Sequence, residues 1–301
     1  MTIEITFLGT SSMVPTKDRN VQGIHFNYNG EGILFDCGEG TQRQMNIAGI
    51  NRLKVKKIFI SHWHGDHVSG LVGLIQTIGN TEYPDTLKIY GPEGSKKYMN
   101  HLLNSCVFDL RINLEVNEFK LKEKKVIEEN SDYYIEAAPL EHGIPCLGYS
   151  FVEKDKRTVN MNALKKYGLK TGPLIGKLQR EENVEFEGKT INYEDVTSVK
   201  KGKKLSIIMD TKQVPNCEVL AENADLLICE ATYESGKENK AEEYNHMTAE
   251  QAAFIANNAN VKKLILTHFS QRYKSVNELE KEAREIFPDT KTAYDFLKLK
   301  I

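Results

Sequence analysis

Three histidines and one aspartate lie within six consecutive residues, and they are the strongest chemical signal in this chain. Residues 61–67 read SHWHGDH and follow an apolar run. In extended backbone, side chains two apart share one face, so His62 and His64 can bind a single cation. A turn at the next glycine then offers Asp66 and His67 to a second cation. Imidazole and carboxylate are ligands suited to zinc and its neighbours, whereas a solvated polar loop has little use for this combination.

Further ligand candidates stand where apolar runs end. Predicted strands at 57–60, 205–209, 226–229 and 263–266 lead to possible ligands or catalytic groups: His62, Asp210, Glu230 and His268. His142 follows a predicted strand at 133–138 after a short loop. Strand ends in layered sheets are where functional sites form. Each residue taken alone fits an ordinary polar strand end equally well, but together they can complete a metal site that the cluster begins.

The elements expected around these residues mix hairpins with helical crossovers. Additional strands are predicted at 3–8, 24–28, 33–36, 87–90, 112–119 and 147–152, and helices at 68–78, 92–103, 248–258 and 276–287. The stretch Asn29–Gly32 between two early strands is typical of a hairpin turn. This mixture favours an α/β protein of layered sheets with helices outside.

Composition and charge exclude several classes of protein. The chain has 301 residues, 40% apolar and 27% charged, which is unlike a disordered tail, a collagen or a disulfide-knotted peptide. The net charge of −2 is too weak a field for a general polyanion binder unless basic residues cluster. From Lys154 to Arg180 they do, with eight basic residues against one acid. This segment predicts a salt-dependent phosphate clamp, and a solvated lysine-rich arm is the alternative.

The sequence shows no recognisable targeting signal, so we expect a cytoplasmic protein. The first residues have no basic start and no apolar run of signal-peptide length. No apolar stretch approaches the roughly 20 residues that span a bilayer, so no membrane is expected. The five cysteines are odd in number and form no C-x-x-C pair, which predicts reduced thiols.

The histidine cluster resembles the signature of the metallo-β-lactamase superfamily. Four more segments narrow the resemblance to the ribonuclease Z family, which processes tRNA 3′ ends: Leu8–Pro15, Pro15–Asn20, Phe35–Gln42 and Glu230–Thr232. The similarity runs along nearly the whole chain and keeps the order of the motifs. It implies one α/β domain over residues 1–301, a four-layer αβ/βα metallo-β-lactamase sandwich. It also implies a protruding basic exosite arm inserted at 153–204.

The resemblance implies two zinc ions per subunit, held by seven side chains. By position, one ion would be held by His62, His64 and His142, the other by Asp66, His67 and His268, with Asp210 bridging them. Two ions in this arrangement would lower the pKa of a bridging water and stabilise the attacking and leaving oxygens of a phosphodiester.

The implied activity is that of a zinc-dependent endoribonuclease that removes the 3′ trailer from precursor tRNA and leaves a 3′-hydroxyl. Asp66 would orient or deprotonate the attacking water. Glu230 would hold one nitrogen of His246, and the other nitrogen would protonate the leaving oxygen. On the residues alone, His246 also fits the start of a helix and Glu230 a buried pair.

The resemblance also implies RNA contacts and a partner. The expected contacts are basic residues or a Gly-Pro motif, in the arm and in an early loop: Lys165, Lys166, Lys170, Gly172, Pro173, Lys17 and Arg19. Lys17 and Arg19 would meet the tRNA 3′ end or its phosphates, and an exposed basic loop is the alternative. In the family, the arm of one subunit serves the active site of the other, which implies a homodimer.

The chain departs from the family pattern at three places. Met209, Lys212-Gln213 and Cys229 stand where the family usually has Gly, Arg-Pro and His, and they leave every expected metal ligand in place.

One alternative function is that of another hydrolase of the same fold, acting on a thioester, lactone or small phosphodiester. A second is a non-catalytic, metal-containing RNA-binding protein. A third, a redox di-iron protein, would typically carry Glu in place of His64.

Overall fold

The computed structural model describes residues 3–81 and 83–301, and the chain divides into two compact units. The core unit comprises the chain up to Glu128, Ile135–Phe151 and Lys204–Ile301. The inserted unit comprises Glu129–Tyr134 and Val152–Lys203. Each unit encloses apolar clusters of its own.

The first large sheet of the core unit has seven strands in the order β20-β1-β3-β4-β5-β6-β7. β3 and β4 form the predicted antiparallel hairpin, turning at Asn29 and Gly30, which both have positive φ. From β4 to β7 the strands are parallel. The strands are β1 (Ile3–Gly9), β3 (Gly23–Tyr28), β4 (Glu31–Phe35), β5 (Val55–Phe59), β6 (Thr86–Pro92), β7 (Asn113–Phe119) and β20 (Lys298–Lys300).

The second large sheet has the order β19-β17-β16-β15-β10-β9-β8. Its strands β15, β16, β17 and β19 are parallel neighbours. The strands are β8 (Lys125–Glu129), β9 (Tyr133–Glu141), β10 (Pro145–Glu153), β15 (Lys204–Ile208), β16 (Leu226–Glu230), β17 (Leu264–Thr267) and β19 (Thr290–Thr292). Two short strands, β2 (Ser11–Ser12) and β18 (Phe269–Ser270), pair separately.

Aromatic side chains join the inner faces of the two sheets. Phe26 and Tyr28 of β3 contact Phe151 of β10, with ring centroids 6.4 and 5.2 Å apart. Phe35 of β4 and Phe59 of β5 contact Tyr149 of β10 at 6.1 and 5.4 Å. Such rings bury large apolar areas, so this layer binds the two sheets to each other.

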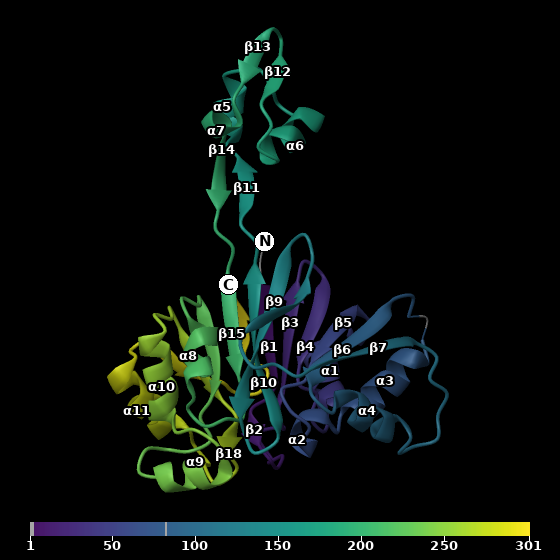
Figure 1. Ribbon diagram of the computed structural model, residues 1–301, viewed down its shortest axis with the longest axis vertical. Helices are drawn as coiled ribbons and strands as arrows, with labels where there is room; N and C mark the ends of the chain where they lie inside the picture. The colour runs from purple at the N-terminus through teal and green to yellow at the C-terminus, as the bar shows by residue number, and fades with distance from the viewer. Residues whose placement is uncertain (1–2, 82) are drawn as a thin grey trace. The chain divides into compact units, whose positions relative to one another are not determined.

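Helices cover the outer faces, because parallel strands buried on both sides need apolar cover on both sides. The first sheet carries α1 (Thr41–Ala48), α3 (Leu71–Gly79) and α4 (Ser95–Leu103), and the second carries α8 (Pro215–Ala221), α10 (Ala249–Asn258) and α11 (Asn277–Ile286) (Figure 1). Shorter helices are η1 (Arg52–Lys54), α2 (Gly65–Val68) and α9 (Glu238–Tyr244). The expected four-layer sandwich is confirmed. Among the described residues, no helix has the length and apolar character that crossing a bilayer requires.

The inserted unit is a small α/β body whose elements were not predicted. Its strands pair as β11 with β14 and β12 with β13. Its buried side chains include Leu164, Leu178 and Ile191. The elements are β11 (Lys156–Val159), α5 (Met161–Lys165), α6 (Pro173–Gln179), β12 (Val184–Phe186), β13 (Lys189–Ile191), α7 (Tyr193–Val196) and β14 (Thr197–Lys200).

Two predicted helices differ from the structure. The helix predicted at 68–78 is interrupted between α2 and α3, where the Gly70 N–H donates to the Cys37 carbonyl at 2.9 Å. The helix predicted at 92–103 begins only at Ser95, because Pro92 ends strand β6 and pairs with Phe119. In both places a contact distant in sequence overrides the local helical pattern. The other predicted strands and helices are present, with ends shifted by up to three residues.

Gly70→Ala should lower the free energy of unfolding by about 2 kcal/mol or more, because overpacking against backbone cannot relax easily. A Cβ there would lie 2.1 Å from the Gly38 carbonyl oxygen. Denaturant unfolding measures the change. Gly73→Ala in α3 is the matched control, since its Cβ would meet nothing nearer than Gln42 Oε1 at 3.7 Å. Equal midpoints for the two variants would contradict the steric account.

Candidate metal centre

Strand ends of the first sheet position the histidine cluster. β4 and β5 are parallel neighbours, so Asp36 after β4 lies beside the segment that follows β5. His64 is extended, with φ −75° and ψ 152°, and it caps α2. Asp66 and His67 lie in that short helix. The predicted extended segment is present, but Asp66 and His67 lie in a short helix and not in a turn that precedes the helix at Val68.

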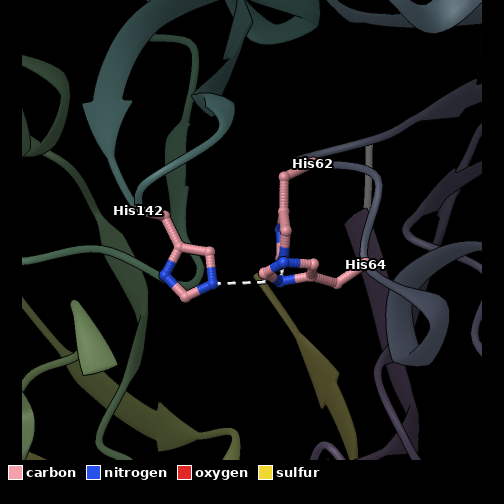
Figure 2. A group of neighbouring side chains, drawn as sticks. All are labelled: His62, His64 and His142. Atoms are coloured by element: carbon pink, nitrogen blue, oxygen red, sulfur yellow. Dashed lines mark hydrogen bonds between the residues drawn. The ribbon is translucent and has the colours of Figure 1, made fainter. Parts of the chain in front are cut away.

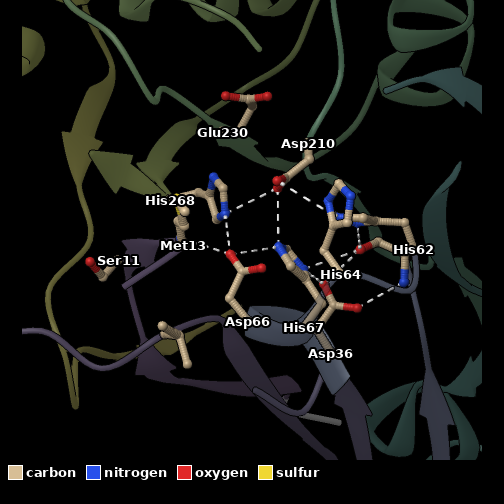
Figure 3. Close-up of polar contacts among 12 residues, drawn as sticks. Ser11, Met13, Asp36, His62, His64, Asp66, His67, Asp210, Glu230 and His268 are labelled. Atoms are coloured by element: carbon tan, nitrogen blue, oxygen red, sulfur yellow. Dashed lines mark hydrogen bonds and ion pairs between the residues drawn. The ribbon is translucent and has the colours of Figure 1, made fainter. Parts of the chain in front are cut away.

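Strand ends of the second sheet supply the facing groups. Because β15, β16 and β17 are parallel neighbours, their carboxyl ends meet at one edge. Asp210 follows β15, Glu230 ends β16, and His268 follows β17. His142 comes from the connection between β9 and β10. Figure 3 shows Asp210, His268 and Glu230 across from Asp66, His67 and His62.

His62, His64 and His142 form the first ligand group. Nδ1 of His64 lies 3.0 Å from Nε2 of His62 and 3.1 Å from Nε2 of His142 (Figure 2). Ligands held 2.0–2.1 Å from one zinc in a tetrahedron lie about 3.3 Å apart, so these three nitrogens fit a single ion.

Asp66, His67, Asp210 and His268 form the second ligand group. One ligand atom from each lies within 4.8 Å of all the others. Oδ1 of Asp210 lies 3.3 Å from Nε2 of His67 and 3.1 Å from Nε2 of His268. Oδ2 of the same carboxylate faces the first group, 3.8 Å from Nε2 of His62 and 3.6 Å from Nε2 of His142. Asp210 therefore stands between the two groups with one oxygen toward each.

Hydrogen bonds to the outer ring nitrogens leave the inner nitrogens free to coordinate. Nδ1 of His67 donates to Asp36 Oδ2 at 2.8 Å, and Nδ1 of His142 donates to the Asn245 carbonyl at 2.8 Å. Nδ1 of His268 lies 3.1 Å from the Thr232 hydroxyl, and Nδ1 of His62 lies 3.0 Å from the Ser61 hydroxyl. Such outer partners fix the tautomer and orientation of a ligating imidazole.

The inner atoms require a positive charge. Among the described residues, His67 Nε2, His268 Nε2 and Asp210 Oδ1 are buried without a hydrogen-bond partner. Burial opposes protonation of His67, yet the carboxylates of Asp210, Asp66 and Asp36 raise its pKa well above the usual range. Burial and the neighbouring imidazoles hold the pKa of His62 well below its usual range. Imidazole and carboxylate groups gathered in this way are a donor set that binds divalent cations.

Glu230 and His246 form a separate pair beside the two groups. Nδ1 of His246 lies 2.9 Å from Oε1 of Glu230, which also accepts the Thr211 N–H at 2.8 Å. Burial alone would lower the pKa of His246, but the Glu230 carboxylate outweighs it and raises the pKa to about 9. The Glu230 carboxylate therefore favours the protonated form of this imidazole.

The loop Pro15–Asn20 differs from the prediction that Lys17 and Arg19 both contact RNA. Lys17 is exposed, but Arg19 is partly buried. Nη2 of Arg19 donates to the carbonyls of Tyr273 at 2.6 Å and Ser270 at 3.4 Å. The guanidinium therefore anchors the loop to the segment that follows His268, while Lys17 faces solvent.

In the inserted unit, ion pairs divide the basic residues into two sets. Lys154, Lys156, Arg157 and Arg180 each pair with a carboxylate of the same unit. Lys165, Lys166, Lys170 and Lys177 are exposed, and none of them has an acidic partner among the described residues. Gly172 and Pro173 are exposed in the same stretch. The whole unit carries twelve basic and ten acidic residues, so its positive charge is local.

Residues around the ligands escaped the sequence analysis. Asp36, Ser61 and Thr232 were given no role, although Asp36 stands at a strand end and the same reasoning would have selected it. At the departures from the family pattern, Met209 and Cys229 are buried. Burial raises the pKa of the Cys229 thiol well above its usual range, so it remains a neutral core side chain.

Comparisons with known proteins agree with this geometry. A protein-family profile described as Anti-Pycsar protein Apyc1 matches residues 3–143. Ribonuclease Z of Methanothermobacter thermautotrophicus is 42% identical over 99% of this chain and 97% of that protein. Ribonuclease Z of Thermococcus onnurineus is 43% identical over 94% of this chain and 90% of that protein. The crystal structure of the short form of human tRNase Z is 28% identical, with a TM-score of 0.73 over 98% of both chains.

Asp36→Asn should weaken the binding of a divalent ion about 10- to 100-fold, because the amide cannot accept both the Ser61 and the His67 hydrogen bonds that the carboxylate accepts. Competition with a chromophoric chelator measures the affinity. Asp109→Asn is the control, since Asp109 is exposed and its ion pair among the described residues is with Arg111. Unchanged affinity in the Asp36 variant would show that the anchor does not tune the site.

Proposed function

Because this chain belongs to the ribonuclease Z family, we infer that it is an endoribonuclease that removes the 3′ trailer from precursor tRNA. The observation that carries this inference is similarity over nearly the whole chain, combined with two adjoining groups of imidazole and carboxylate ligands. The match covers both units, so it includes the insertion as well as the metal-ligand groups. A thioester or lactone hydrolase of the same fold would have no evident use for that insertion.

We propose two zinc ions per subunit, one for each ligand group. His62, His64 and His142 would hold the first, Asp66, His67 and His268 the second, and Asp210 would contribute one oxygen to each. Support comes from the inward-facing nitrogens and from the division of the Asp210 oxygens between the groups. When bound, such ions supply positive charge to the phosphodiester and lower the pKa of a water molecule.

The side chains themselves would move two protons. Asp66 would accept the proton of the water whose oxygen attacks phosphorus. As the bond from phosphorus to the 3′-oxygen breaks, Nε2 of His246 would give its proton to that oxygen. The tRNA then ends in a 3′-hydroxyl, and the trailer retains the phosphate. Glu230 keeps His246 charged for this step, because its carboxylate raises the imidazole pKa to about 9 although burial opposes it.

RNA would be held by the unpaired lysines of the inserted unit and by Lys17. Lys165, Lys166, Lys170 and Lys177 present four cations without competing carboxylates, next to the exposed Gly172-Pro173 turn. Neutralising phosphates with such residues releases counterions and makes binding dependent on salt. We propose that the protein works as a homodimer in the cytoplasm, in keeping with its five free cysteines.

His64→Ala and Asp66→Ala should each reduce cleavage of a precursor tRNA with a 3′ trailer by at least about a thousandfold, since each removes a metal ligand. Binding of the same RNA should change by less than about threefold, because the lysines are untouched. Gel analysis of the products and fluorescence anisotropy measure the two effects. Loss of binding together with cleavage would contradict the separation of roles.

Replacing Lys165, Lys166, Lys170 and Lys177 by Gln should do the reverse. Binding should weaken, and the slope of log Kd against log salt should fall by about 3 to 4, since each phosphate contact contributes about 0.9. Gln at Lys154, Lys156, Arg157 and Arg180 is the matched control, because these four cations are already paired. Equal effects in the two quadruple variants would refute the division into two sets.

A further inference from the structure

Two exposed apolar side chains line a cavity that reaches part of both ligand groups. The cavity measures about 410 Å³, and its walls include Met13 and Tyr244 next to Asp66, His142 and His246. Met13 is 75% exposed and Tyr244 is 55% exposed. Neither side chain has a part in the metal site or in the proton transfers described above.

Met13 is held in a strained turn. Its φ is 61°, and the Val14 N–H donates to the Ser12 carbonyl at 2.7 Å, which makes Met13 the central residue of a γ-turn with positive φ. Glycine adopts this conformation without steric cost, whereas methionine does not. Its own N–H donates to Asp66 Oδ2 at 2.7 Å, so the turn is tied to the second ligand group (Figure 3). The hydrogen bond to Asp66 therefore holds the exposed Met13 side chain beside that carboxylate, although the backbone conformation is strained.

Tyr244 lines the same cavity from the segment that carries His246. It ends α9, and Asn245 after it has a φ of 56° and a ψ of 51°. The Asn245 carbonyl accepts Nδ1–H of His142, and His246 is bound to Glu230. The Tyr244 side chain is 55% exposed, so much of its ring is available to a ligand.

We propose that these two side chains hold the bases on either side of the scissile bond. Tyr244 stacks on the base of the last tRNA nucleotide, and Met13 packs against the base of the first trailer nucleotide. This proposal rests on the proposed function. The leaving 3′-oxygen belongs to the last tRNA nucleotide and is protonated by His246, so Tyr244, two residues away, lies on that nucleotide's side. Met13 lies beside Asp66 and faces the remaining base.

The chemistry of the two side chains suits bases of any sequence. Every base offers a face to an aromatic ring, and such stacking does not depend on hydrogen-bond readout. The methionine thioether is flexible and polarizable, so it adapts to different bases. A site that must accept many tRNAs and many trailers gains affinity from these contacts without selecting a sequence.

The test is equilibrium binding to RNAs that lack one base. All proteins carry His64→Ala, so that no cleavage occurs during the measurement. The probes are an intact precursor tRNA, one with an abasic ribose as the last tRNA nucleotide, and one with an abasic ribose as the first trailer nucleotide. Tyr244→Leu should weaken binding of the intact RNA about tenfold. It should have no effect on the RNA that lacks the last tRNA base.

Met13→Gly should weaken binding of the intact RNA about fivefold, by loss of apolar contact, and should not affect the RNA without the first trailer base. This variant keeps the N–H that Asp66 accepts and removes the strain, so its unfolding midpoint should rise. Tyr244→Phe, which keeps the ring, should bind within about twofold of the parent on all three RNAs.

Equal losses on intact and abasic RNA, or no loss on intact RNA, would overturn the proposal. If the Tyr244→Leu loss disappears on the RNA without the first trailer base, and the Met13→Gly loss on the RNA without the last tRNA base, the two bases are assigned to the wrong side chains. If the wild-type chain binds precursor tRNA without cutting it, the proposed function fails while the binding series still decides this inference. If it binds no precursor tRNA at all, both fail.

Discussion

The buried carboxylate of Asp210, surrounded by inward-facing imidazoles, is the interaction on which the rest of the structure depends. It lies almost out of contact with water, and its Oδ1 has no hydrogen bond among the described residues. An uncompensated buried charge costs several kcal/mol, which is comparable with the whole stability of a domain. The fold must therefore supply positive charge at this point. It brings imidazoles and carboxylates from both sheets to one edge, where together they can bind a divalent cation beside Asp210.

The sequence predicted which side chains come together, because they follow a simple rule. Polar residues directly after apolar strands gather at one edge when the strands are parallel neighbours, as β15, β16 and β17 are. Asp210, Glu230 and His268 were found in this way. The hydrogen-bond partners of the imidazoles were not found, because the contacts of Ser61 with His62 and of Thr232 with His268 exist only in the folded chain. Local patterns failed for the same reason at Gly70 and Pro92, where a neighbour distant in sequence decides the backbone.

The sequence predicted the net charge of the basic segment, but not which of its cations form ion pairs in the fold. The run of basic residues from Lys154 to Arg180 was evident, yet half of its charges are paired with carboxylates of the same unit, several of which lie outside that run. Pairing between exposed groups contributes little to stability. It does determine which cations remain available to a polyanion. Arg19 illustrates the same principle, since the positive charge counted in the sequence is committed to backbone carbonyls in the fold.

The longer segment of the inserted unit, Val152–Lys203, is inserted between strands β10 and β15 of the second sheet. β10 and β15 are adjacent strands, and the Glu153 N–H donates to the Lys203 carbonyl at 2.8 Å, so the two ends of the insertion already meet. This segment connects two neighbouring strands, and it brings an apolar core of its own. Evolution, or a protein engineer, can therefore exchange this module for another recognition module of different length without altering the register of the strands that carry the chemistry. One hydrolytic scaffold can acquire new macromolecular substrates by such grafting, with its reactive residues untouched.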